Sequence, residues 1–326
     1  MPHRNPRMTL NRFLVERQRQ HPSATGRFTR FMGQIGTVAK IISNYMRRAA
    51  IEGLIGQTGD ANVQGEQVKI LDDLGNRVFV EAFEYVDMVG MIVSEEMESA
   101  RSVEADNATD RSYAVMVDPV DGSSNIDVNG IIGSIFSVHD IIGTARESCQ
   151  QKGAEQVAAG YMIYGPSTVL VYTAGYGVHS FVLDHTIGEF VLMYDNITMP
   201  ERGNIFSANI GNYNKWDKRA QSYTDAFMDE SNAYSLRYSG ALLADLHQIL
   251  HRGGVYYYPA ETQRSEGKLR LLYECAPLAM IAEQAGGAAT DGSRRIMDIE
   301  PDNIHQRSPL FIGSKHEVAM IQNVLS

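Results

Sequence analysis

Two short apolar runs that end abruptly in acidic residues constrain this chain more than any other feature of its sequence. Residues 91–93 stop at Ser94-Glu95-Glu96, and residues 113–117 stop at Asp118-Pro119. Apolar runs of this length are typical of buried strands, and the polar residues that follow lie where each strand reaches an edge of its sheet. The sequence therefore predicts buried strands with carboxylates at a sheet edge.

The rest of the chain mixes helical and strand patterns. Residues 169–194 predict an antiparallel meander, because turn sequences separate three apolar runs. Thr25 is a candidate cap for the first long helix, and Ser314 with Glu317 forms a candidate capping box for the last. Helices are predicted at residues 28–51, 77–86, 239–250 and 277–285, and in the C-terminal segment.

The pattern changes after Asp195, from a meander to alternating strands and helices. We therefore expect a domain boundary near residues 195–200. The N-terminal domain, residues 1–197, contains the acidic strand ends, and the C-terminal domain comprises residues 198–326.

The composition excludes several classes of protein. The chain has 326 residues and a net charge of −10, which disfavours general binding to nucleic acid because the phosphate backbone would be repelled. Cys149 and Cys275 cannot form a disulfide framework, so a reducing, cytoplasmic setting is expected. No apolar run approaches the length needed to span a bilayer, so we expect no membrane partner.

The segment Asp118-Pro119-Val120-Asp121-Gly122-Ser123-Ser124-Asn125 is the most informative stretch of the chain. Its glycine and serines predict a tight turn into a helix N-terminus, where the backbone N–H groups of residues 122–124 would bind phosphate. Carboxylates beside such an anion site are explained by a divalent cation that lies between them and the phosphate. The alternative is an ordinary turn with a helix cap.

The candidate metal ligands are all oxygen atoms. They are the carboxylates of Glu95, Asp118 and Asp121 and the carbonyl of Val120. Magnesium or manganese suits such ligands, and no group of His and Cys has zinc spacing. Taken alone, Glu95 and Glu96 also fit a plain acidic loop.

Two later segments contain further polar candidates. Lys268 and Arg270 could hold phosphate and Glu274 could add a carboxylate, although a basic pair before an apolar run is usually solvated surface. Tyr256 and Tyr258 alternate as strand-packing residues do, but tyrosine hydroxyls at a strand end also bind sugar or phosphate oxygens.

Several motifs, in the right order, give the chain a clear resemblance to a known family. It resembles the class I fructose-1,6-bisphosphatases, within the lithium-sensitive, metal-dependent sugar phosphatase superfamily, from about Thr9 to the C-terminus. This resemblance implies an α/β fold, a layered α/β/α/β/α sandwich with two mixed sheets. The motifs are NVQGE (62–66), SEE (94–96), DPVDGSSNID (118–127), AAGYMIYGPST (158–168), GKLRLLYECAP (267–277), EQAGG (283–287) and IHQRSP (304–309).

The resemblance also implies an activity and its residues. It implies magnesium-dependent hydrolysis of the 1-phosphate of fructose 1,6-bisphosphate, with several ions per site and manganese as a possible substitute, in gluconeogenesis or a related carbon pathway. Glu96 matches the carboxylate that helps to activate the attacking water, and Asp72 matches one that assists. The matching metal ligands are Glu95, Asp118, Asp121, Glu274 and the Val120 carbonyl.

The substrate contacts implied by the resemblance lie in both halves of the chain. Arg237 matches an arginine that reaches into a neighbouring subunit's site, which implies a homo-oligomer, usually a tetramer. The residues that match the family's contacts at and around the 1-phosphate are Asp121, Gly122, Ser123, Ser124 and Arg270. Those that match its contacts to the sugar and the 6-phosphate are Asn209, Tyr238, Tyr258 and Lys268, with Tyr256 in the same aromatic run.

The chain departs from this family where AMP binds in many members. Arg27 replaces a usual glutamate, Ser112 replaces a lysine that binds the AMP phosphate, and His139-Asp140 occupies the region of a Tyr-Arg pair. We therefore expect AMP inhibition to be weak, absent or altered. Two alternative functions stay open: a sedoheptulose-1,7-bisphosphatase or dual enzyme, and a non-catalytic metal- or phosphate-binding regulator.

Overall fold

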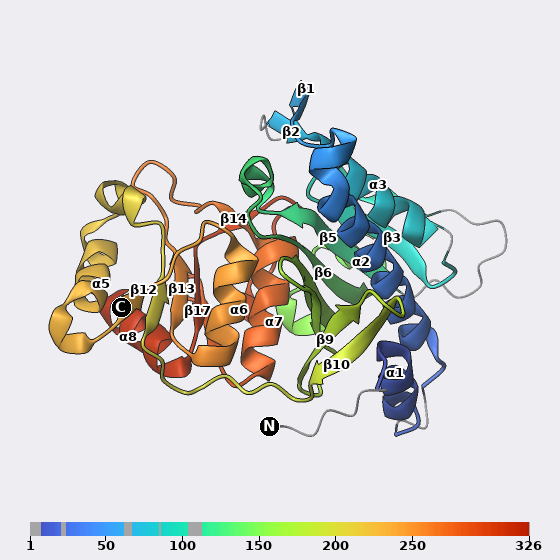
Figure 1. The fold of residues 1–326 in the computed structure, drawn as a ribbon. Helices are drawn as coiled ribbons and strands as arrows, with labels where there is room; N and C mark the ends of the chain where they lie inside the picture. The colour runs from blue at the N-terminus through green and yellow to red at the C-terminus, as the bar shows by residue number, and fades with distance from the viewer. Residues whose placement is uncertain (1–7, 21–23, 62–66, 85, 104–112, 326) are drawn as a thin grey trace.

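Helices and two sheets alternate in layers through the molecule. The computed structural model describes residues 8–20, 24–61, 67–84, 86–103 and 113–325. In Figure 1, helices α2 (Arg27–Glu52) and α3 (Ile70–Glu84) cover the outer face of the first sheet, and α6 (Leu242–Arg252) and α7 (Ala276–Gln284) lie between the two sheets. Helices α5 (Lys218–Met228) and α8 (Lys315–Leu325) cover the far side of the second sheet, so the predicted α/β/α/β/α sandwich is confirmed.

The first sheet has eight strands in the order β10-β9-β8-β7-β6-β5-β3-β4. All neighbours are antiparallel except β3 and β5, which are parallel. The predicted meander is confirmed as β8 to β10. The strands are β3 (Val89–Ser94), β4 (Arg101–Ser102), β5 (Tyr113–Asp121), β6 (Ile132–Asp140), β7 (Gln156–Tyr164), β8 (Thr168–Thr173), β9 (Val178–Asp184) and β10 (Glu189–Tyr194).

The second sheet is smaller and mixed. Its order is β12-β11-β13-β17-β15, with parallel pairing of β11 to both β12 and β13 and antiparallel pairing of β17 to β13 and β15. Its strands are β11 (Ile205–Ser207), β12 (Ser235–Leu236), β13 (Val255–Tyr258), β15 (Ala288–Thr290) and β17 (Leu310–Gly313). Two-stranded pairs are formed by β1 (Gln57–Ala61) with β2 (Gln67–Lys69) and by β14 (Leu269–Arg270) with β16 (Arg307–Ser308).

Apolar side chains fill the space between the layers. Under α2 and α3, Phe31 stacks on Phe83 with ring centroids 5.4 Å apart, and both rings are fully buried. Between the sheets, Leu246 of α6 and Leu278 of α7 belong to one apolar cluster with residues of both sheets. Burial of this extent is the main favourable term in folding. Two further α-helices of the described residues are α1 (Leu10–Gln18) and α4 (Ala145–Cys149).

Three local predictions about helix ends were wrong. Helix α3 begins at Ile70, seven residues before the predicted start, with Asp72 in its first turn, where a carboxylate is favourable. Helix α2 is capped by Gly26 in the left-handed region rather than by Thr25. The hydroxyl of Ser314 donates to the Pro200 carbonyl (2.6 Å) instead of forming a capping box.

Other predictions were close. The predicted helices at 28–51, 239–250 and 277–285 correspond to α2, α6 and α7, with ends shifted by up to three residues. Within the described part of the chain, no helix is both long and apolar enough to cross a membrane. The motif at residues 62–66 and Ser112 lie outside the described residues.

Candidate metal and phosphate site

The parallel pairing of β3 and β5 brings the two acidic strand ends to one edge of the first sheet. Ser94 is the register partner of Val117, and the Glu95 N–H donates to the Val117 carbonyl at 3.1 Å. Glu95 and Glu96 therefore follow β3 beside the point where Asp118 stands in β5. The prediction of carboxylates at a sheet edge is confirmed, although β5 continues as far as Asp121.

Three carboxylates gather at this edge. Oxygen atoms of Asp118, Asp121 and Glu274 lie within 4.8 Å of one another. The three residues are only 2%, 9% and 7% exposed, respectively. Burial, followed by the charge of Glu95, raises the pKa of Asp118 and of Glu274 well above the usual range. Such a cluster requires either protons or cations to offset its negative charge.

The donor set fits a hard divalent cation. Carboxylate oxygens are the atoms that magnesium and manganese prefer, and His and Cys side chains are absent from this described cluster. The Val120 N–H donates to Asp118 Oδ1 at 3.1 Å, and this bond fixes the backbone beside the candidate carbonyl ligand. The residues present therefore fit the metal that the resemblance implies.

Asp121 connects the carboxylates to the C-terminal half of the chain. Its Oδ2 accepts a hydrogen bond from the Leu243 N–H (3.3 Å) in the first turn of α6. Burial raises the pKa of Asp121 to about 6, and the Leu243 N–H and the charge of Lys268 offset part of that rise. A helix N-terminus and a lysine thus favour the ionised carboxylate.

Glu274 reaches the cluster from an irregular helical turn. Residues Leu271–Cys275 form a π-helical turn, η5, immediately before α7. The Arg270 N–H donates to Glu274 Oε2, and Arg270 Nε lies 3.9 Å from Glu95 Oε1. Arg270 is 4% exposed, so a buried guanidinium lies among the carboxylates, where it can also face an anion.

The glycine-serine segment forms the predicted tight turn into a helix N-terminus, and the helix is a short 3-10 helix. Gly122 has φ +81°, a left-handed conformation that glycine adopts without strain, and Ser123–Val128 form a 3-10 helix, η1. The Pro119 carbonyl just before it accepts the Ser134 hydroxyl at 2.6 Å. The turn is therefore anchored directly beside the carboxylates.

The two candidate catalytic carboxylates occupy different positions. Glu96 is near enough to Asp118 for its charge to help raise the pKa of Asp118. Asp72 is 5% exposed in the first turn of α3 and accepts the Lys69 N–H at 3.0 Å. Helix α3 packs on β5 through Gly75, where a Cβ would lie only 2.6 Å from a Val120 methyl group. Asp72 therefore lies on the neighbouring helix, outside the three-carboxylate cluster.

Two pairs of the candidate sugar contacts lie near each other, Tyr258 with Lys268 and Tyr258 with Tyr238. Lys268 Nζ lies 5.8 Å from the ring centroid of Tyr258. Burial and the neighbouring Tyr258 and Asp245 raise the pKa of Tyr238 to about 12. Asn209 precedes a 3-10 helix, η3 (Ile210–Lys215).

Arg237 stands apart from this group, whereas the Tyr256 hydroxyl is near enough to Tyr238 and Tyr258 for them, after burial, to help raise its pKa. Arg237 is exposed after β12, where its guanidinium donates to the Leu236 carbonyl at 3.1 Å. Tyr256 is only 3% exposed and belongs to the apolar cluster between the sheets, so strand packing describes it better than a surface contact does.

Asp245 is a polar residue of this region that the sequence reasoning missed. Its carboxylate accepts the Ser239 N–H (3.0 Å) and the Ser207 hydroxyl (3.0 Å), and its charge helps to raise the pKa of Asp121. It is 6% exposed on α6, among leucines that the helical pattern assigned to the core. An acid beside the apolar face of a predicted helix was the signal that could have identified it.

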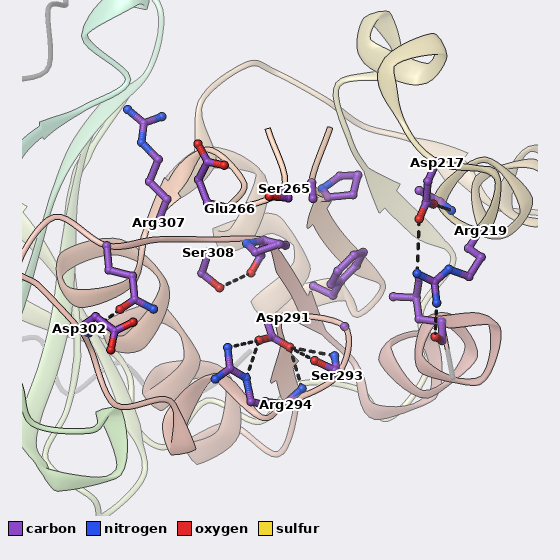
Figure 2. Close-up of a pocket in the computed structure, with 18 of the residues that line it drawn as sticks. Asp217, Arg219, Ser265, Glu266, Asp291, Ser293, Arg294, Asp302, Arg307 and Ser308 are labelled. Carbon is purple, nitrogen blue, oxygen red and sulfur yellow. Dashed lines mark hydrogen bonds and ion pairs between the residues drawn. The ribbon is translucent and has the colours of Figure 1, made fainter. Parts of the chain in front are cut away.

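Two sizeable cavities of the described structure lie away from the carboxylates. One of about 790 Å³ lies on the C-terminal half, and Figure 2 shows that several of its charged groups already bind one another, as Arg294 does with Asp291 at 3.0 Å. Another, of about 690 Å³, is lined by aromatic residues together with Arg27, Tyr113 and Asp140. This second cavity contains residues of the region that the resemblance assigns to AMP.

Comparisons with known proteins agree with this geometry. The family model for the fructose-1,6-bisphosphatase N-terminal domain matches residues 8–195, and that for the C-terminal domain matches residues 199–326. Class 1 fructose-1,6-bisphosphatases of Chlorobium luteolum and Persephonella marina are 46% and 44% identical, over 97% and 98% of both chains. The crystal structure of Leishmania major fructose-1,6-bisphosphatase in holo form superposes with a TM-score of 0.91 at 38% identity, covering 97% of this chain and 98% of that one. The chain belongs to the fructose-1,6-bisphosphatase family.

Proposed function

We propose that this protein hydrolyses the 1-phosphate of fructose 1,6-bisphosphate to give fructose 6-phosphate and inorganic phosphate. The observation that carries the proposal is the buried cluster of Asp118, Asp121 and Glu274, within 4.8 Å of one another. Arg270 and Lys268 provide positive charge beside it. Carboxylates for cations and basic groups for phosphate are the parts that hydrolysis of a phosphate monoester requires.

The cofactor in this proposal is Mg²⁺, with Mn²⁺ as a possible substitute and several ions per site. The ligands would be Glu95, Asp118, Asp121, Glu274 and the Val120 carbonyl. When bound, such cations lower the pKa of a coordinated water and neutralise charge on the phosphate and the leaving oxygen.

Different residues of the chain would activate the water and hold the phosphate. Glu96 accepts the proton of the attacking water, and Asp72 assists from α3. The backbone N–H groups of residues 122–124, with Arg270, hold the 1-phosphate and offset the negative charge that develops on its oxygens. The Leu243 N–H keeps Asp121 in place by its hydrogen bond of 3.3 Å.

The sugar and the second phosphate would lie against the C-terminal half. Asn209, Tyr238, Tyr258 and Lys268 would provide the contacts, and Arg237 would reach the site of a neighbouring subunit in a homotetramer. The exposure of Arg237, whose guanidinium donates to the adjacent Leu236 carbonyl, supports that role. We place the domain boundary between residues 197 and 198 and the protein in the cytoplasm, in gluconeogenesis or a related carbon pathway.

We also propose that AMP is a weak inhibitor or none. Asp140 lines the 690 Å³ cavity with Arg27, and its carboxylate would repel the phosphate of a nucleotide. The lining also contains Arg17 and Arg27, so the obstacle lies at Asp140 itself and not in the net charge or the volume of the cavity.

The test is phosphate release from fructose 1,6-bisphosphate, with magnesium and with a chelator, for the wild type and for Glu96→Gln. We expect magnesium-dependent release, and a loss of about 100- to 10,000-fold in kcat in the variant, the usual contribution of a positioned proton acceptor. Substrate binding should change little. Glu98→Gln, at an exposed acid two residues away, is the matched control and should keep full activity.

Two outcomes would replace the proposal. Release of phosphate from sedoheptulose 1,7-bisphosphate but not from fructose 1,6-bisphosphate would show that the seven-carbon sugar is the substrate. Binding of metal and phosphate without release from either sugar would make the protein a regulator.

A further inference from the structure

His305 belongs to a motif of the family resemblance that has no role in the proposed mechanism. The motif covers residues 304–309. The Nδ1 atom of His305 lies 2.7 Å from the hydroxyl oxygen of Tyr273, the fully buried residue before the candidate metal ligand Glu274 on η5. His305 thus contacts one of the segments that form the candidate metal site.

The ring of His305 also lies beside a second segment of that site. Burial lowers the pKa of His305, and the backbone of Met97 opposes this effect. Only a hydrogen-bond acceptor favours the protonated ring, so the Met97 carbonyl lies beside it. The Met97 N–H donates to the Ser94 carbonyl at 3.2 Å, which closes the turn that contains Glu95 and Glu96.

The two contacts of His305 determine which ring nitrogen carries the hydrogen. The other nitrogen, Nε2, is buried and makes no hydrogen bond of its own within the described residues. A neutral imidazole has a single N–H group, and a carbonyl oxygen can only accept. Nε2 therefore carries the hydrogen and faces the turn after β3, while Nδ1 accepts the hydroxyl hydrogen of Tyr273. The ring bridges the turn and η5.

The backbone around His305 is held firmly. The His305 N–H donates to Asn303 Oδ1 at 3.0 Å, and the Gln306 carbonyl accepts the Leu271 N–H at 2.8 Å. The side chain of Ile304 packs on an apolar cluster that includes residues of β3. The imidazole therefore has a fixed base from which to restrain the turn after β3.

We propose that His305 is a positioning residue that holds Glu96 beside the carboxylate cluster, at the place where it accepts a proton from the attacking water. His305 acts through the turn after β3, and Tyr273 keeps the ring in the tautomer that donates to this turn. The inference rests on the proposed function, because it gives Glu96 the role described there.

Two substitutions of His305 separate its two contacts. In His305→Asn, the amide oxygen takes the place of Nδ1 and accepts from Tyr273, but the side chain is too short to reach the turn. In His305→Gln, the longer side chain places an NH₂ group where Nε2 was and can donate to the turn. His316→Asn, at an exposed histidine on α8, is the matched control.

The measurement is kcat and KM for fructose 1,6-bisphosphate in saturating magnesium. We expect His305→Asn to lower kcat about 10- to 100-fold, the usual cost of losing an outer group that orients a reacting one, with KM within about twofold. His305→Gln should restore most of the lost kcat, and His316→Asn should behave as the wild type.

A second comparison shows whether His305 acts through Glu96. In the Glu96→Gln background no carboxylate remains to be positioned, so His305→Asn should lower kcat no further. A residue with a merely structural role would lower kcat by the same factor in both backgrounds. Tyr273→Phe removes the group that sets the tautomer and is a second variant, which should lower kcat only when the Glu96 carboxylate is present.

The inference and the proposed function fail in different ways. A wild type that hydrolyses neither sugar bisphosphate would refute the function. An active wild type whose His305→Asn variant keeps its kcat, raises KM instead, or loses the same factor in the Glu96→Gln background would refute the inference alone. Circular dichroism melting of each variant excludes misfolding as the cause of a lowered kcat.

Discussion

The crowding of three buried carboxylates makes a prediction about stability that needs no substrate. Asp118 is 2% exposed and shares a 4.8 Å cluster with Asp121 and Glu274. Replacing Asp118 by Asn removes one negative charge while keeping an oxygen that can accept the Val120 N–H. We expect Asp118→Asn to stabilise the metal-free protein.

The magnitude follows from Coulomb's law. Two unit charges 4.8 Å apart repel by about 3.5 kcal/mol at an effective dielectric constant of about 20. Partial protonation of the cluster and the nearby Arg270 relieve part of this repulsion, so a net gain of about 1–3 kcal/mol is expected. For a chain of 326 residues, that gain corresponds to a rise in Tm of about 2–5 °C.

Thermal unfolding in a chelating buffer and in magnesium measures both consequences. Magnesium should raise the Tm of the wild type, because a cation bound to the folded state alone stabilises it. The Tm of Asp118→Asn in chelator should be higher than that of the wild type, and magnesium should raise it little. Asp73→Asn, at an exposed acid that pairs with Arg77 on α3, is the control for the same change in net charge. A lower Tm for Asp118→Asn in chelator would refute the reasoning.

Two further predictions concern the phosphate turn and the cavity near the N-terminus. Gly122→Ala places a Cβ at φ +81° and should cost about 1–2 kcal/mol of unfolding free energy together with most of the activity. Gly175→Ala, at φ +82° with open space around it, should cost similar stability in denaturant titrations but no activity. AMP should inhibit the wild type weakly in an activity titration, and Asp140→Asn should strengthen the inhibition by removing the repelling carboxylate. Tight inhibition of the wild type by AMP would contradict this prediction.

Strong periodicity made the long elements predictable from the sequence. Residues 28–51 repeat apolar side chains at helical spacing, and α2 occupies Arg27–Glu52. The strand end at Ser94 was also predictable from the end of the apolar run, whereas β5 continues past Asp118 as far as Asp121 with its carboxylates buried. These features depend on local pattern and on burial, which a single sequence displays.

The features that the sequence did not reveal depend on contacts between distant segments. Ser314 and Glu317 have the spacing of a capping box. Instead, the Ser314 hydroxyl bonds the Pro200 carbonyl and the Gly254 N–H, and the Glu317 carboxylate accepts the Gly203 N–H. The π-helical turn that carries Glu274 leaves no periodic signal in five residues. Local propensity yields to tertiary contacts in such places.

Asp121 explains why the site requires both halves of the chain. Asp121 lies on β5 of the first sheet, yet its carboxylate is held by the Leu243 N–H at the start of α6. Three residues into that helix, Asp245 accepts hydrogen bonds from Ser207 and Ser239 in the C-terminal half. One helical turn thus ties the candidate metal ligand Asp121 to Ser207, at the end of β11, and to Ser239, which follows Tyr238. A displacement of α6 would therefore shift Asp121 and the segments at Ser207 and Ser239 together, which makes this helix the link between the candidate metal ligands and the candidate sugar contacts.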